Sequence, residues 1–99
     1  MAKNQAEMVL ASLEVIDKEI EYNRTQIEEL LKKIGNLEKR KENIVNSISE
    51  ITNPQYKKLL YLRFVKGMKW EAIAEEMHYA IQHIHRMRKE AIKEFEKNI

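Results

Sequence analysis

One feature of the sequence limits what this chain can fold into: a repeat with alternating spacings of three and four runs from Leu13 to Ile51, and ten of its twelve positions are Leu or Ile, the other two being Asn23 and Lys41. Sustained spacing of this kind predicts a coiled coil. A helix of roughly 45 residues would be about 70 Å long, and its stripe is too long and narrow to be buried against the rest of the chain. In a heptad labelled a to g, the apolar a and d positions, which we expect to form the dimer contact, are Leu13, Ile16, Ile20, Ile27, Leu30, Ile34, Leu37, Ile44, Ile48 and Ile51.

The charges that flank the stripe favour a parallel homodimer. In that arrangement a g position meets the following e position of the partner, which brings Glu19 to Arg24 and Lys33 to Glu38. Each exposed pair contributes well under about 1 kcal/mol, so the pairs indicate orientation more than stability. Gly35-Asn36 allows an alternative, a helical hairpin. The heptad phase continues across these two residues, and this favours one continuous helix.

A boundary falls at Asn53-Pro54, because Asn caps helix N-termini well and Pro suits the first helical position. We therefore expect a coiled-coil oligomerisation helix over residues 1–52 and a second domain over residues 53–99. The first part holds eight Lys and Arg against ten Asp and Glu, and the second holds ten against six. The net charges are thus −2 and +4, a distribution in which only the second part is suited to a polyanion.

Residues 53–99 predict three short helices, so the expected fold class is all-α. The first runs from Pro54 to about Val65 and is ended by Gly67. The second begins near Trp70 and the third after Ala80. The apolar positions expected to face the core are Tyr56, Leu59, Leu60 and Phe64 in the first helix and Ile84, Met87, Ala91 and Phe95 in the third.

The tight junction over residues 78–80 fits a helix-turn-helix motif, with the small residue Ala74 where the two helices cross. Such a junction would hold the third helix at a fixed angle, so that its outer face could enter the major groove of DNA. We expect base contacts from Ile81, Gln82, His83 and Arg86. We expect contacts with the DNA backbone from His85, Lys89, Lys93, Lys66 and Lys69.

The segment YLRFVKGMKWEAIAEEMHYAIQHIHRMRKEAIKEF resembles region 4 of sigma-70 type transcription initiation factors. It is still more similar to small phage and prophage regulators with a region-4-like domain, such as the ArpU-type late regulators. The matching elements are LRFVKG, WEAIAEEM and the IxxMxxxAI ending, within about residues 54–97. The resemblance implies a transcription regulator that binds promoter-like double-stranded DNA, with RNA polymerase as a candidate second partner. His78, Lys69 and Ala80 depart from the family, which usually has Gly or Asn at the first position and Ser or Thr caps at the others.

Several functions find no support in the sequence. It contains no cysteine, no catalytic Ser/His/Asp set, no Gly-rich phosphate loop and no carboxylate cluster with metal-ligand spacing. We therefore expect a protein that is not an enzyme, with no metal, cofactor or small-molecule substrate. No apolar run approaches the roughly 20 residues of a membrane span, and no signal peptide is evident, so we expect a place in the host bacterial cytoplasm.

Two alternative functions keep the same architecture. Small terminase subunits of phages also combine helix-turn-helix domains with helical oligomerisation, and they bind packaging sites on DNA. A protein-interaction adaptor would instead bind RNA polymerase without DNA. Two side chains also carry open interpretations: Trp70 is expected in the core, and Arg63 is expected either at a DNA phosphate or paired with an acid such as Glu75.

Overall fold

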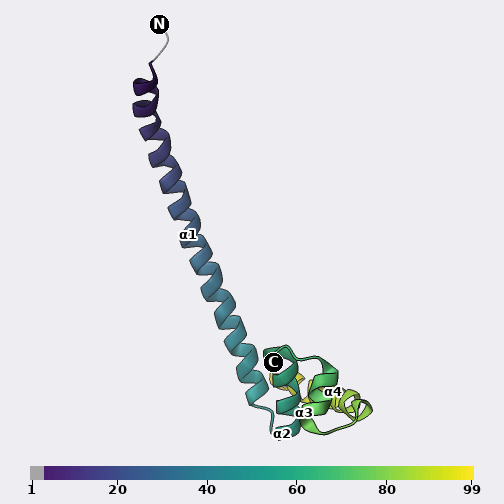
Figure 1. The fold of residues 1–99 in the computed structure, drawn as a ribbon. Helices are drawn as coiled ribbons and strands as arrows, with labels where there is room; N and C mark the ends of the chain where they lie inside the picture. The colour runs from purple at the N-terminus through teal and green to yellow at the C-terminus, as the bar shows by residue number, and fades with distance from the viewer. Residues whose placement is uncertain (1–3) are drawn as a thin grey trace. The chain divides into compact units, whose positions relative to one another are not determined.

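The computed structural model describes residues 4–99, which form four α-helices and one π-helical turn (Figure 1). In chain order these are α1 (Gln5–Ser49), α2 (Pro54–Leu60), η1 (Tyr61–Val65), α3 (Trp70–Met77) and α4 (Ile81–Glu96). The described residues contain no β-strand, so the predicted all-α class is confirmed. The chain divides into two compact units, Met1–Glu38 and Lys39–Ile99. Of the domain predicted over residues 1–52, residues 1–3 lie outside the described part.

Helix α1 passes through Gly35 and Asn36 without interruption, so the helical hairpin does not form. A Cβ atom placed on Gly35 would meet nothing within 4 Å, and the glycine costs only about 1 kcal/mol of helix stability relative to Ala. The aliphatic a and d side chains of the described part of the first unit are about half exposed, from 44% at Ile20 to 58% at Leu13. None of the described helices is both long enough and apolar enough to cross a membrane.

The core of the unit Lys39–Ile99 joins the end of α1 to the helices that follow it. Its buried members are Ile48, Ile51, Leu59, Leu60, Ile73, Ala74, Ile84, Met87 and Ala91. Helices α2 and α4 make the most extensive contact, and α3 also packs against α4. No polar side chain within residues 4–99 is buried. The interior of the unit is therefore packed from apolar side chains.

Ile48 and Ile51 correct the predicted dimer contact. They are only 4% and 2% exposed within a single chain, so they have no surface left to offer a partner. The predicted stripe of dimer contacts therefore ends at Ile44, which is 49% exposed. The compact unit that begins at Lys39 includes both residues together with the end of α1.

The predicted cap of α2 is confirmed. The Asn53 side-chain Oδ1 accepts hydrogen bonds from the backbone N–H groups of Gln55, at 2.9 Å, and Tyr56, at 3.2 Å. Near the other end of the unit, Asn98 and Ser47 are bonded reciprocally. The Ser47 Oγ donates to the Asn98 carbonyl at 3.3 Å, and the Asn98 Nδ2 donates to the Ser47 carbonyl at 3.2 Å. This pair ties the last residues of the unit to the end of α1.

The turn η1 changes the prediction for Phe64. The Lys66 N–H donates to the Tyr61 carbonyl at 3.0 Å, a bond between residues five apart that defines a π-helical turn. Such a turn holds one residue more than an α-helical turn, so the side chains that follow are rotated around the axis. Leu62 and Val65 pack against the core, whereas Phe64, expected on the buried face, is 62% exposed. Gly67, with φ of +72°, then ends the segment as predicted.

Truncating Ile51 should destabilise the whole unit, because it removes most of a fully enclosed side chain from a small core. We expect Ile51→Ala to lower the free energy of unfolding by about 2–5 kcal/mol, measured by urea denaturation at fixed protein concentration. The matched control is Val15→Ala, which truncates an aliphatic side chain that is 64% exposed at position c of the heptad. The control should change stability by less than about 0.5 kcal/mol. Equal effects of the two substitutions would show that Ile51 lies outside the core.

Candidate nucleic-acid interface

The junction between α3 and α4 consists of His78, Tyr79 and Ala80. His78 has φ of 59° and ψ of 40°, the left-handed conformation that usually ends a helix at Gly or Asn. The Tyr79 N–H donates to the Ala74 carbonyl at 3.0 Å, which closes the end of α3 in the manner of a Schellman motif. Ala80 is extended, and α4 begins at the next residue. The chain thus reverses direction in three residues without a glycine.

Close packing fixes the angle of α4 against α3. Ile73 and Ile84 have no exposed surface, and Met87 is 5% exposed. Ala74 is 7% exposed, and its small side chain permits the close approach that the sequence predicted. Because these contacts are buried and apolar, α4 cannot turn about its own axis without opening the core. The side of α4 that faces solvent is therefore fixed.

Polar and basic side chains occupy that solvent side. Successive residues of an α-helix are separated by about 100° around its axis, so the face opposite Ile84, Met87 and Ala91 can be read directly from the sequence. The members of this face, all exposed, are Gln82, His85, Arg86, Lys89 and Lys93, with the carboxylate of Glu96 in the last turn of the helix. Lys93 is 3.6 Å from the Glu90 carboxylate, an exposed pair that salt screens easily. The other four form no ion pair within residues 4–99.

Two of the predicted base-contacting residues have a different environment. Ile81 is half-buried and packs against the core. His83 is also half-buried, and its ring lies 4.6 Å from the Tyr79 ring, centroid to centroid. The Tyr79 hydroxyl accepts a hydrogen bond from Gln55 Nε2 at 2.6 Å, which links this cluster to the start of α2. Ile81 and His83 thus anchor the first turn of α4, and Gln82 and Arg86 remain as the exposed candidates for base contact.

Trp70 is half-buried at the start of α3, and cations and rings surround it. The Arg63 guanidinium lies 5.1 Å from the Trp70 ring centroid and the Arg88 guanidinium 5.4 Å from it, both within cation–π range. The rings of Phe64 and His85 each stand 6.4 Å away at a steep angle. Trp70 therefore holds side chains of η1 and α4 in place at one edge of the candidate interface.

Arg63 stabilises the loop between η1 and α3. Its Nη1 donates to the Met68 carbonyl at 2.8 Å, across the loop that joins η1 to α3. Of the two interpretations offered by the sequence, pairing with Glu75 is not observed. A phosphate contact would compete with the loop bond and with Trp70. This half-buried guanidinium is best explained as the support of residues 66–69, from which Lys66 and Lys69 extend as exposed cations.

Arg88 is a candidate that the sequence reasoning missed. It is exposed, lies against Trp70, and lines a shallow depression together with His85, Lys89 and Lys93. The sequence does contain a signal for it, because residues three apart on a helix are neighbours, which places Arg88 beside His85. The depression also includes the carboxylates Glu90 and Glu96. The positive surface is thus concentrated toward the start of α4.

Comparison of the chain with protein-family models, with curated proteins and with solved structures gives no match.

His78 offers a direct test of the junction. A non-glycine residue in the left-handed conformation costs about 1–2 kcal/mol, part of which is offset because glycine loses more backbone entropy on folding. We expect His78→Gly to raise the free energy of unfolding by up to about 1 kcal/mol, measured by urea denaturation. His78→Val, with its branched Cβ, should lower it. A decrease for His78→Gly would indicate that the imidazole itself stabilises the turn.

Proposed function

We propose that the chain is a sequence-specific DNA-binding regulator of transcription. In this proposal α3, the turn over residues 78–80 and α4 act as a helix-turn-helix motif, and α4 enters the major groove. The observation that carries the proposal is the solvent face of α4. A buried apolar side fixes the rotation of the helix. On the opposite side, the first three turns carry Gln82, His85, Arg86 and Lys89, and a carboxylate, Glu96, appears on that side only at the end of the helix.

The side chains divide by the part of DNA that they would contact. Gln82 and Arg86 are exposed in the first turns of α4, where a recognition helix meets base edges. Glutamine suits adenine, and arginine suits guanine, because each can form two hydrogen bonds to that base. Phosphates would be contacted by cations around this centre, which position the protein without reading sequence. These cations are Arg88, Lys89, Lys93, Lys66 and Lys69, and the imidazole N–H of His85 is a further donor to phosphate.

A homodimer fits this function. The half-exposed a and d side chains from Leu13 to Ile44 would be covered by a second, parallel copy of α1. The pairs Glu19 with Arg24 and Lys33 with Glu38 favour that orientation. Two copies related by symmetry would prefer two half-sites related by symmetry. The resemblance to phage and prophage regulators with a sigma region-4-like domain supports promoter-like DNA as the target and RNA polymerase as a candidate second partner.

DNA recognition can be tested by selecting fragments from a random pool, sequencing them, and measuring affinity for the preferred site by fluorescence anisotropy. Arg86→Ala should cost about 1–3 kcal/mol on that site and relax selectivity at one base pair. Lys66→Ala or Lys69→Ala should weaken binding to all sequences alike and reduce its dependence on salt, because each removes one phosphate contact. The control is Lys18→Ala, which removes a cation from the acidic first part of the chain and should leave binding unchanged.

Two results would contradict the DNA-binding proposal. One is the absence of any binding to DNA at low salt, where phosphate contacts are strongest. The other is unchanged selectivity when Gln82 and Arg86 are both replaced by Ala. In either case the exposed face of α4 would be a surface for a protein, and the adaptor alternative would replace DNA recognition. A ring-sized oligomer bound to DNA would instead favour the packaging alternative.

The dimer has a separate test. Replacing both Ile27 and Leu30 with Lys should abolish association, because each side chain would bury an aliphatic surface worth about 1.5–3 kcal/mol. Sedimentation equilibrium of the wild type and the variant at micromolar concentration measures this directly. Val15→Lys with Tyr22→Lys adds the same charge at the exposed c positions and should leave the dimer intact. A wild-type monomer under these conditions would disprove the coiled coil.

A further inference from the structure

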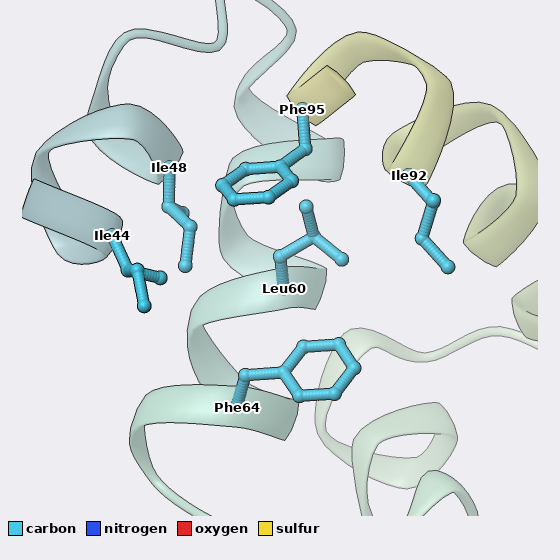
Figure 2. Close-up of a pocket in the computed structure, with 6 residues that line it drawn as sticks. All are labelled: Ile44, Ile48, Leu60, Phe64, Ile92 and Phe95. Atoms are coloured by element: carbon cyan, nitrogen blue, oxygen red, sulfur yellow. The ribbon is translucent and has the colours of Figure 1, made fainter. Parts of the chain in front are cut away.

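An apolar hollow lies on the unit Lys39–Ile99 at the end of α1. Its volume is about 270 Å³, and it is lined by Ile44, Ile48, Leu60, Phe64, Ile92 and Phe95 (Figure 2). These residues come from α1, α2, η1 and α4, and none of them is polar. The hollow is distinct from the solvent face of α4, which carries the candidate DNA contacts.

The hollow has a buried floor and an exposed rim. Ile48 and Leu60 are 4% and 3% exposed, so they belong to the core. Ile44 and Phe64 are 49% and 62% exposed, although both are large and apolar. Exposed apolar surface around a hollow is typical of an interaction site. The π-helical turn places Phe64 there, and within its own chain one edge of its ring stands against Trp70 while most of the side chain stays exposed.

The heptad pattern indicates what covers the hollow. Ile44 occupies a d position and Ile48 the following a position, so the hollow continues the same series of a and d residues that runs from Leu13. In a parallel pair of identical helices, each a or d residue meets its own copy across the symmetry axis. The charges at Glu19 and Arg24 complement each other in that arrangement. A surface continuous with this series is therefore suited to a second copy of the chain.

We propose that the hollow is the end of the dimer interface and is closed by the second copy, with Ile44 and Phe64 of each copy packed against the partner. The proposal rests on the homodimer proposed above and extends it. Ile48 is held in the core of its own chain and α1 ends at Ser49, so the pairing of the two α1 helices cannot continue past Ile44. Beyond Ile44, the contact with the second copy is made instead by Phe64, which does not belong to the heptad repeat. The two copies of the unit Lys39–Ile99, one from each chain, are then held at a fixed spacing, and so are their two α4 helices.

The first test is Phe64→Ser in the full chain, with association measured by sedimentation equilibrium. We expect the dissociation constant of the dimer to rise by about ten-fold or more, with the helix content unchanged. Tyr22→Ser is the matched control, since Tyr22 is 64% exposed at a c position, and it should leave association unchanged. On DNA, Phe64→Ser should also broaden the range of half-site spacings that are bound, while selectivity within each half-site is retained.

Cross-linking provides a second test that does not remove Phe64. The sequence contains no cysteine, so Ile44→Cys introduces a single thiol at the proposed axis. Mild oxidation should form a disulfide between two copies of the Ile44→Cys variant, and it should form none between two copies of the Tyr22→Cys variant. The fluorescent dye ANS should bind the Ile27→Lys, Leu30→Lys monomer, where the hollow is open, more strongly than the wild-type dimer.

The outcomes separate this inference from the proposals on which it rests. If Phe64→Ser dimerises as tightly as wild type and Ile44→Cys does not cross-link, the hollow lies outside the interface and the inference fails, although the coiled coil stands. If the wild-type dimer binds ANS as strongly as the monomeric variant, an apolar ligand or another protein is the occupant, and the inference again fails. DNA selectivity is measured independently, so its loss in Gln82 and Arg86 variants bears on the DNA-binding proposal alone.

Discussion

The rest of the structure depends on the burial of Ile48 and Ile51 beneath the helices that follow them. A unit of three short helices has little apolar surface to bury and is marginal alone. The end of α1 and the residues directly after it supply two of its nine buried residues, Ile48 and Ile51. The a and d face of α1 continues toward the N-terminus with aliphatic side chains that are about half exposed, so one stripe of residues has two different environments. Its last turn contributes to a core, and its earlier turns carry the aliphatic side chains through which we proposed a homodimer.

That core in turn determines which residues meet solvent on α4. Ile84 and Ala91 are fully buried, so the opposite face of α4 is turned toward solvent. No further interaction is needed to fix the helix in this orientation. The polar contacts lie at the edges of this apolar core. Gln55, Tyr79 and His83 support the first turn, and Arg63 and Trp70 support the loop before α3. A rigid apolar side with polar supports at its margins suits a helix that must present side chains at fixed positions.

The sequence predicted features that depend on local chemistry. The length of α1, the Asn53 cap, the end at Gly67 and the start of α4 all follow from periodicity or from residues a few positions apart. The missed features depend on tertiary context. Nothing local shows that Ile48 and Ile51 leave the heptad series for the core. The bond from Lys66 to Tyr61 that exposes Phe64 differs from an α-helical bond by one residue. The environment of His83 depends on Tyr79, and that of Arg63 on Met68 and Trp70.

The reciprocal bonds between Ser47 and Asn98 bear on the order in which the chain acquires structure during synthesis. They join residues 51 positions apart, and Phe95 packs on the same core. Contacts this distant in sequence form late, because the intervening chain must be ordered first. These bonds therefore form only after the segment through Asn98 has left the ribosome. The residues of the aliphatic stripe of α1 are made much earlier, so the homodimer proposed above would begin to form between two nascent chains while their remaining helices are still being made.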